Sequence, residues 1–231
     1  MRSYWDDRAH KNAAWYVDTS LDFDLPDMER FFRTGQLIVA DALDNAPAEL
    51  RAHRLAVEIG AGLGRVCLAL ADRFERVVGI DIAPEMVLRA KELVRDPRVT
   101  FELGDGASLS AVKDASADLV LSFTVFQHIP DLAVIDSYVR EAGRVLQPGG
   151  LLVVQWNNEP GPVRWRVRRA ALGLLQRSGV RPERHGRHAP EFLGARIPMK
   201  RMRRALDSSA LELVGTRNEG TLYTWAWAVK R

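Results

Sequence analysis

The sequence is poor in cysteine and has no long apolar runs or repeats. Its 231 residues include a single cysteine, Cys67, so neither an intramolecular disulfide nor a cysteine metal cluster can form. No apolar stretch reaches the length of a membrane-spanning helix, and the polar, mixed-charge start MRSYWDDRAHKN is not typical of a signal peptide. Repeats and low-complexity linkers are also absent from the sequence. We therefore expect a globular, cytoplasmic protein in which Cys67 is a buried, inert thiol.

Negative charge is scarce in one part of the chain. Residues 161–204 contain twelve arginines and one lysine against two glutamates, a net charge of +11. Because the whole chain carries +3, the remainder carries −8. A basic block of this size indicates either an anionic partner or substrate, or simply a solvated face or a lid.

The length and composition suit one α/β domain with additions. Hydrophobic residues make up 47% of the chain and charged residues 27%, which is ordinary for a globular protein with a sizeable core. We expect an N-terminal helical arm or lid at residues 1–50 and a main domain at residues 51–231. Within the main domain, a basic helical insertion is expected at about residues 158–198.

Short apolar runs alternate with helical patterns through the middle of the chain. Five runs read as buried strands: Leu55–Gly60, Arg76–Asp81, Arg98–Asp105, Ala117–Phe123 and Leu151–Trp156. Helical patterns separate most of them: GRVCLALADRF, PEMVLRAKELV and DLAVIDSYVREAGRVL, the last stopped by Gln147-Pro148-Gly149-Gly150. This alternation is typical of parallel βαβ units in a doubly wound sheet.

Further elements flank this region. An apolar-periodic helix is predicted for about residues 27–48, preceded by an arm rich in tyrosine and tryptophan. After the fifth strand, KRMRRALDSSA looks helical, and LELVGTRNE and TLYTWAWAVKR look like strands. Because a short Asn-Glu-Gly turn joins these two strands, we expect them to pair as an antiparallel hairpin.

The sharpest motif is EIGAGLG, which closes the first strand. Its glycines at positions 60, 62 and 64 allow a tight turn and a close approach to a ligand. The helix that follows offers free N–H groups at its start. Asp81 ends the second strand, and a carboxylate there can accept hydrogen bonds from both hydroxyls of a ribose. The motif therefore predicts a nucleoside-containing cofactor.

Its spacing argues against a dinucleotide. The dinucleotide fingerprint G-x-G-x-x-G has a third small residue for close helix packing, but Arg65 occupies that position here. The acidic Glu58 beside the loop would repel a pyrophosphate, whereas it suits a ligand with a cationic sulfonium and an ammonium group. A nicotinamide-dependent oxidoreductase is therefore disfavoured.

Six motifs together resemble the class I S-adenosylmethionine-dependent methyltransferases, of Rossmann-like fold and small-molecule type. They are EIGAGLG, GIDIAPEM, FELGDG, ADLVLSF, FQHIPD and RVLQPGG, and they span about Leu55 to Asn157. The resemblance implies S-adenosylmethionine as cofactor and S-adenosylhomocysteine as product. It also implies an α/β fold with a mostly parallel, seven-stranded, doubly wound sheet that ends in an antiparallel hairpin.

The resemblance implies cofactor-binding roles for the ends of the first two strands. Glu58, Gly60, Ala61 and Gly62 would surround the methionine moiety, and Asp81 would hold the ribose hydroxyls. Six further residues would complete the cofactor site: Ile82 and Met86 near the adenine, Asp105 with Gly106 at the adenine amino group, and Ser122 and Phe123 beside the methyl group. Ordinary turn formation by Asp105 and plain core packing by Met86 stay open as alternatives.

His128, in FQHIPD, is the candidate general base. It lies just past the fourth strand, at the carboxyl edge where open α/β sheets bind ligands, and its intrinsic pKa suits proton transfer near neutrality. Tyr16 is a possible catalytic partner, as in some relatives that pair such a histidine with an N-terminal tyrosine. The alternatives are that His128 packs its loop and that Tyr16 closes over the cofactor.

The expected reaction is methyl transfer to oxygen or nitrogen of a small molecule, and an anionic or carrier-bound acceptor stays open. The arginine-rich segment 161–204 leaves an RNA methyltransferase as one alternative, although no RNA-binding module is recognisable and SFTVFQHIP lacks the Asn/Asp-Pro-Pro-aromatic tetrad of many base-methylating relatives. Another alternative is a member of the fold that binds the cofactor without transferring methyl. No metal site is expected, because His185 and His188 lack nearby cysteine and have few acidic neighbours.

Overall fold

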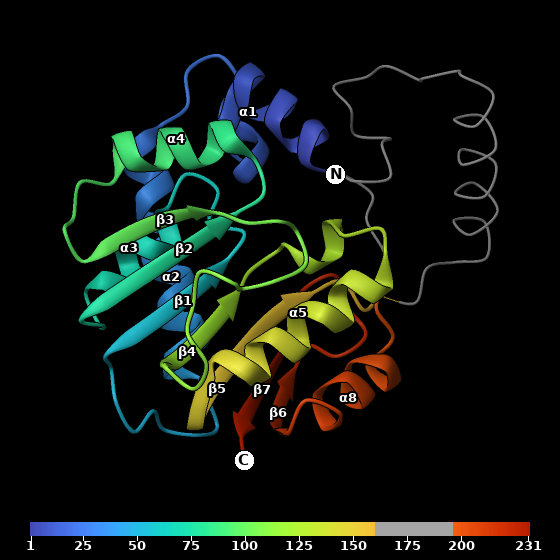
Figure 1. The fold of residues 1–231 in the computed structure, drawn as a ribbon. Helices are drawn as coiled ribbons and strands as arrows, with labels where there is room; N and C mark the ends of the chain where they lie inside the picture. Colours follow the sequence, from blue (N-terminus) through green and yellow to red (C-terminus); the bar gives the residue numbers. More distant parts are fainter. Residues whose placement is uncertain (160–195) are drawn as a thin grey trace, which may run out of the picture.

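The computed structural model of the protein describes residues 1–159 and 196–231. Over these residues the strands form one seven-stranded sheet (Figure 1). In chain order they are β1 (Leu55–Ile59), β2 (Arg76–Asp81), β3 (Val99–Leu103), β4 (Ala117–Ser122), β5 (Leu146–Trp156), β6 (Leu211–Arg217) and β7 (Thr224–Lys230). The helices are α1 (Arg2–Val17), α2 (Met28–Asp44), α3 (Arg65–Ala71), α4 (Pro84–Leu93), the short 3-10 turn η1 (Phe126–His128), α5 (Leu132–Val145) and α8 (Met199–Asp207).

The strand order is β3-β2-β1-β4-β5-β7-β6. Strands β1 to β5 pair in parallel, whereas β7 is antiparallel to both β5 and β6. The predicted α/β class, the doubly wound sheet and the C-terminal hairpin are thereby confirmed. The strand order reverses between β1 and β4, and open α/β sheets bind their ligands in the crevice beyond the carboxyl ends of strands at such a point.

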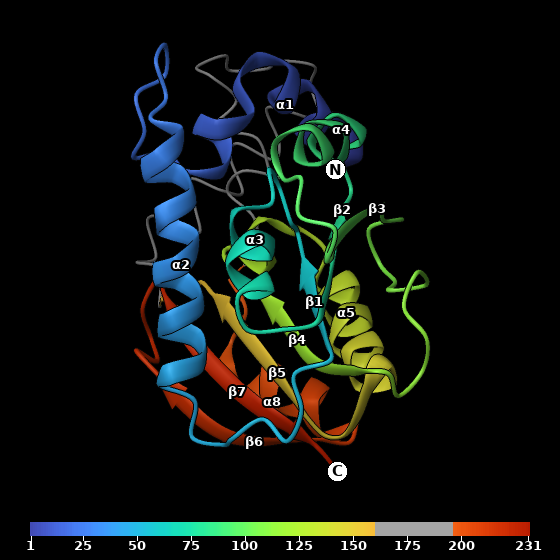
Figure 2. The same ribbon diagram turned by 90° about the vertical axis from the view of Figure 1, so that its left-hand side faces the viewer.

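Helices cover both faces of the sheet, as its apolar strands require. Side chains alternate along β5: Leu152 and Val154 join the core beneath α5 and α8, whereas Leu151 and Val153 join the core beneath α2, α3 and α4. Figure 2 shows α2 and α5 on opposite sides of the strands. The sheet is therefore sandwiched, and its open edge for ligands is the carboxyl edge.

The predicted aromatic arm is helical. Helix α1 contacts α4 at the top of the view in Figure 1, and its alanines pack with Phe31 and Met86 in a separate small core. The helix kinks at Asn12, whose backbone is extended (φ −167°) and whose side chain accepts a hydrogen bond from the Trp15 N–H at 3.0 Å. Asn12 thus caps the second half of α1, the half that ends at Val17.

Strand β5 begins earlier than the sequence pattern predicted. The proline and glycines at 148–150 predicted a break before a strand at Leu151, yet β5 runs from Leu146. Its register against β4 shifts between two pairs, Ala117 with Leu146 and Leu119 with Leu151. Residues 147–150 therefore form an irregularity within the strand, with Gly149 at φ +81°, rather than a separate loop.

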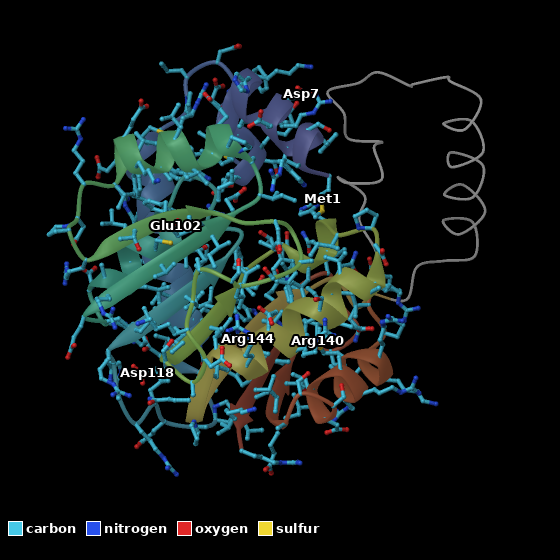
Figure 3. The ribbon with its side chains drawn as sticks, viewed as in Figure 1. Met1, Asp7, Glu102, Asp118, Arg140 and Arg144 are labelled. Carbon is cyan, nitrogen blue, oxygen red and sulfur yellow. The ribbon has the colours of Figure 1, made fainter. Side chains whose placement is uncertain are left out.

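The amino edge of the sheet carries a buried carboxylate of its own. Asp118, at the start of β4, accepts hydrogen bonds from the backbone N–H groups of Arg54 (2.7 Å) and Leu55 (3.0 Å). Figure 3 shows it at the opposite end of the molecule from Met1, which lines the cavity described below. Because its lone pairs are engaged by backbone at the start of β1, we assign Asp118 to strand alignment rather than to the site.

The basic insertion expected at about residues 158–198 lies mostly outside the described residues. At its two ends, the Ile197 N–H donates to the Asn157 carbonyl at 3.3 Å, and the Trp156 indole donates to the Ile197 carbonyl at 2.9 Å. In the described ranges 1–159 and 196–231, no helix is both long and apolar enough to cross a membrane.

Candidate active site

The glycine-rich loop after β1 folds back against the end of β2. The N–H groups of Gly60 and Ala61 both donate to the Ile80 carbonyl, at 2.7 and 3.1 Å. Gly60, Gly62 and Gly64 all have positive φ angles, of +77°, +53° and +83°. Since only glycine adopts this region without strain, the spacing of the three glycines dictates the sharp turn.

Neighbouring side chains press closely on this loop. A Cβ atom added to Gly60 would lie 2.2 Å from a Val125 methyl, and one added to Gly62 would lie 2.9 Å from a Val17 methyl. Val125 follows β4, whereas Val17 ends α1. The segment after β4 and the end of α1 therefore both pack on the loop. A side chain at Gly60 or Gly62 would clash with the valine that packs there.

Asp81 closes the turn at the end of β2. Its two carboxylate oxygens accept hydrogen bonds from the backbone N–H groups of Gly62 (2.8 Å) and Ala83 (2.9 Å). Burial raises the pKa of this carboxyl despite those bonds. Each oxygen keeps a second lone pair, so Asp81 can still accept from the two hydroxyls of a ribose.

Glu58 is a second acidic group beneath the loop, and its side chain is 3% exposed. Its Oε2 accepts a hydrogen bond from the Cys67 thiol on α3 at 2.8 Å. Burial raises the pKa of Glu58 to about 8. Burial also raises the pKa of Cys67 well above its ordinary value, so the thiol keeps its proton.

One cavity brings most of the predicted site residues together. It lies beyond the carboxyl ends of β1, β2 and β4 and is partly open to solvent. Ten of the residues predicted from the sequence line it: Tyr16, Glu58, Gly60, Ala61, Gly62, Asp81, Ile82, Met86, Phe123 and His128. Among the described residues, no group of histidine, cysteine and acidic side chains is arranged to hold a metal ion.

Three predicted residues do not line this cavity. The exposed Asp105 carboxylate accepts hydrogen bonds from the Ala107 and Ser108 N–H groups and from the Ser108 hydroxyl, at 2.7–2.8 Å. These bonds lower the pKa of Asp105 and hold its turn. Gly106, at φ +92°, packs against Ile82, and the buried Ser122 lies 3.4 Å from the Ile59 carbonyl, to which its hydroxyl donates. Their roles in cofactor binding stay predictions.

Aromatic side chains gather where β4 gives way to η1. His128 ends η1 and meets the edge of Trp5 from α1, with ring centroids 5.2 Å apart. The Gln127 amide lies 3.4 Å from Nε2 of His128. Tyr16 is 6% exposed and packs edge-on against Trp15. An acceptor that entered this cavity would meet the imidazole of His128, the phenols of Tyr16 and Tyr138, and apolar walls.

The sequence analysis gave no role in the site to several residues that line the cavity, among them Val17, Arg65, Thr124, Val125 and Tyr138. Thr124 is the most unusual of these, because its φ of +58° is strained for a β-branched residue. The buried Gln155 fixes it: its amide oxygen accepts from the Thr124 N–H at 2.9 Å while its amide nitrogen donates to the Leu222 carbonyl at 3.0 Å. No pattern in the sequence predicts this hydrogen bond between Gln155 and the Thr124 backbone.

The cavity fits the cofactor that the sequence resemblance implies. Gly60 and Gly62 line the cavity with backbone alone, and Asp81 keeps acceptors for a ribose. Ile82 and Met86 offer apolar contact for a base. Glu58 and Asp81 place acidic groups near the loop, which suits a ligand that carries a sulfonium and an ammonium group.

Comparison with known proteins supports this interpretation. Residues 57–154 match the family model described as a methyltransferase domain. A protein of Synechocystis sp. named 2-methyl-6-phytyl-1,4-hydroquinone methyltransferase is 34% identical over 161 residues, covering 68% of this chain and 47% of that protein. The chain thus spans about half the length of the curated relatives it matches.

Solved structures share the fold. A crystal structure titled as a SAM-dependent methyltransferase of Methanosarcina mazei has a TM-score of 0.61 at 22% identity, covering 84% of this chain and 96% of that one. The cyclase SpnF has a TM-score of 0.55 at 21% identity, covering 82% and 60% of the two chains. Fold and site define a Rossmann-like, cofactor-binding α/β domain of the methyltransferase type. The chain belongs to the class I S-adenosylmethionine-dependent methyltransferases, whose cofactor is S-adenosylmethionine.

The raised pKa of Glu58 predicts that cofactor binding depends on pH. Below about pH 8 the buried carboxyl is largely protonated, and a cationic ligand favours its ionised form, so binding should release a proton. Between pH 6 and 7.5 the affinity for S-adenosylmethionine should rise with pH, by at most about tenfold per pH unit for one proton. Titration calorimetry in buffers of different ionisation enthalpy measures both the affinity and the released proton.

Glu58→Gln is the matched control for this prediction. The ligand's own α-amino group titrates at a pKa of about 8, so the difference between variant and wild type isolates Glu58. A pH dependence that persists unchanged in the variant would rule out Glu58 as its origin. The same raised pKa makes the stability of the free protein depend on pH. The Glu58 carboxyl ionises near 4.5 in the unfolded chain and near 8 in the folded one, so its contribution to the free energy of unfolding is lost as the pH rises between these values.

Proposed function

We propose that this protein transfers the methyl group of S-adenosylmethionine to an oxygen or nitrogen atom of a small molecule. The observation that carries the proposal is the single cavity in which the glycine loop and Asp81 of the cofactor site meet His128 and Tyr16. Methyl transfer is an in-line displacement at a sulfonium carbon, so the cofactor supplies the electrophile. The protein must align the acceptor, take up its proton and exclude water.

Each of these tasks has candidate residues. Trp5, Tyr16 and Phe123 line the cavity and would exclude water around the acceptor. His128 would take the proton of the acceptor hydroxyl or amine, with Tyr16 as its catalytic partner. Alignment of acceptor and methyl donor contributes on the order of 7 kcal/mol or more in well-oriented reactions.

The type of acceptor follows from two lines of support. The cavity combines aromatic and aliphatic walls with polar groups that can orient a ligand, as small-molecule sites do. The relative from Synechocystis is named for a hydroquinone with a methyl and a phytyl substituent, which is an aromatic hydroxyl compound. We therefore start the acceptor search with phenols and hydroquinones, followed by small carboxylic acids and amines.

The first experiment is titration calorimetry of cofactor-stripped protein with S-adenosylmethionine, S-adenosylhomocysteine and NADH. We expect micromolar binding of the two sulfur compounds and none of NADH. The protein is then incubated with S-adenosylmethionine and each acceptor, and S-adenosylhomocysteine and methylated product are followed by mass spectrometry. Absence of binding by a folded protein would overturn the cofactor assignment.

The alternatives predict different results in the same series. A member of the fold that does not transfer methyl would bind S-adenosylmethionine and leave its methyl group in place during turnover. An enzyme acting on RNA would show filter-binding affinity that falls steeply as salt rises, because phosphate contacts release counterions. Salt-dependent RNA binding together with methylation of RNA would replace the small-molecule proposal.

A further inference from the structure

Arg65 begins α3 directly after the glycine loop, and its charge is buried. Its side chain is 8% exposed, and one guanidinium nitrogen donates to the Asp18 carboxylate and to the Thr34 hydroxyl, both at 2.7 Å. A second guanidinium nitrogen donates to the Val17 carbonyl at 3.3 Å. The guanidinium also lies over the Phe31 ring, 5.1 Å from its centroid. Both N-terminal helices therefore meet at one arginine.

The hydrogen bonds of Asp18 orient its carboxylate toward Arg65. Asp18 follows the last residue of α1, and its side chain is 15% exposed. Its Oδ1 accepts from the Ser20 N–H and hydroxyl, which leaves Oδ2 for Arg65. Although burial alone would raise it, the hydrogen bonds from Ser20 and the charge of Arg65 hold the pKa of Asp18 below its ordinary value. The pair is therefore ionised at neutral pH.

The ion pair fixes residues that touch the cavity. Tyr16 and Val17 immediately precede Asp18, and both line the cavity. A Val17 methyl presses on Gly62, at the place where the cofactor's methionine moiety is expected. Arg65 thus directly follows the glycine loop in the chain, and its side chain also binds the end of α1. Opening α1 requires separation of a buried ion pair.

The backbone of Arg65 is fixed as well. A Cβ atom added to Gly35 of α2 would lie 2.1 Å from the Arg65 carbonyl, so α2 and α3 cross in close contact at this glycine. Helix α2 cannot shift along α3 without a clash, and Thr34 beside Gly35 holds the guanidinium. The arginine is consequently a rigid anchor, and Asp18 is the movable half of the pair.

We propose that Arg65 and Asp18 are positioning residues that latch α1 over the bound cofactor, so that separation of this pair limits cofactor release. The proposal rests on the proposed function for the identity of the ligand, whereas the latch itself is a property of the ligand-free chain. Breaking a buried pair by removal of one partner leaves the other charge uncompensated, which is strongly unfavourable. The latch therefore stays closed until α1 moves as a unit.

The test uses Asp18→Asn, because this neutral, nearly isosteric change removes the charge of Asp18 and leaves the Arg65 anchor in place. The first readout needs no ligand: hydrogen exchange of residues 2–17 should speed up while that of β1 and β4 stays unchanged. The second readout is the dissociation rate of S-adenosylhomocysteine, followed by the intrinsic tryptophan fluorescence of the chain, to which Trp5 and Trp15 on α1 contribute. We expect dissociation to accelerate about tenfold, as weakening of a gating contact should produce.

Asp44→Asn is the matched control. Asp44 ends α2 and pairs with Arg73, which follows α3, so it also joins α2 to the α3 region through one carboxylate and one arginine. That pair is exposed, and exposed pairs contribute little. Asp44→Asn should leave both readouts at the wild-type value. Asp18→Glu, which keeps the charge, should restore slow dissociation at least in part.

The outcomes separate the latch from the proposed function. Faster exchange of residues 2–17 in Asp18→Asn, with no ligand binding even by wild type, would show that the pair holds α1 but would overturn both the cofactor assignment and the control of release. Unchanged exchange and unchanged dissociation in a folded variant would overturn the latch and leave the proposed function standing. Equal acceleration of exchange across the whole chain would show that Asp18 serves global stability, which also overturns it.

Discussion

Replacement of Asp81 by alanine should weaken S-adenosylmethionine binding by roughly 100-fold or more. Two hydroxyl groups of the ribose would lose a charged acceptor, and hydrogen bonds to charged groups contribute about 1.5–3 kcal/mol each. The change also removes the acceptors of the Gly62 and Ala83 N–H groups, so the loop itself should loosen. Calorimetric titration with S-adenosylmethionine and S-adenosylhomocysteine measures the loss, which should be similar for the two because they share the ribose.

Two further variants make this result specific. Asp81→Asn keeps one acceptor oxygen and should lose less affinity than Asp81→Ala. Asp72→Ala removes an exposed carboxylate at the far end of α3 and should leave affinity unchanged. Wild-type affinity in a folded Asp81→Ala protein would show that the ribose is held elsewhere. The same titration of Asp105→Ala tests whether that turn carboxylate also contacts the adenine.

Replacement of His128 by alanine should lower kcat by about 100-fold or more, within the range that general acid–base catalysis contributes. Cofactor affinity should stay within about threefold of wild type, because single contacts outside the binding determinants have small effects. The reason is position: His128 lines the cavity from η1, whereas the glycine loop and Asp81 follow β1 and β2. The measurement compares kcat, KM and the cofactor dissociation constant, with the acceptor found by screening.

The pH–rate profile distinguishes a base from a packing residue. If His128 takes the acceptor proton, the acidic limb of the kcat profile should disappear in His128→Ala. His53→Ala is the control, because His53 lies exposed beside Phe74, before β1. A parallel loss of cofactor affinity and turnover would make His128 a structural partner of Trp5, with which it is in edge-on contact.

Local sequence patterns predicted the fold and the part of the cavity formed by the glycine loop and Asp81. Apolar, β-branched runs separated by helical periods are read correctly because the central strands β1 and β4 are buried on both faces. The glycines at 60 and 62 and the carboxylate of Asp81 were predictable because a sharp strand–helix turn needs positive φ angles at fixed spacing. The structure brings these three residues to one cavity.

Contacts between distant segments were not predictable in the same way. Arg65 was read only as an obstacle to a dinucleotide, whereas it binds Asp18, 47 residues earlier in the chain. The strained Thr124 depends on an amide 31 residues later, at Gln155. Neither pair has a characteristic spacing, because the fold alone brings them together. The early start of β5 escaped prediction for a related reason, since a bulge tolerates the proline and glycines that usually end a strand.

The hydrogen bond from Cys67 to Glu58 has a practical consequence for spectroscopy. Cys67 is the only cysteine in the sequence, its thiol is fully buried, and burial and the neighbouring carboxyl keep it protonated. Maleimides and similar reagents require an accessible thiolate, so the native chain offers them no reactive partner. A single cysteine introduced on an exposed turn of α1 would therefore carry a fluorophore or spin label without background, and no other position would have to be altered first.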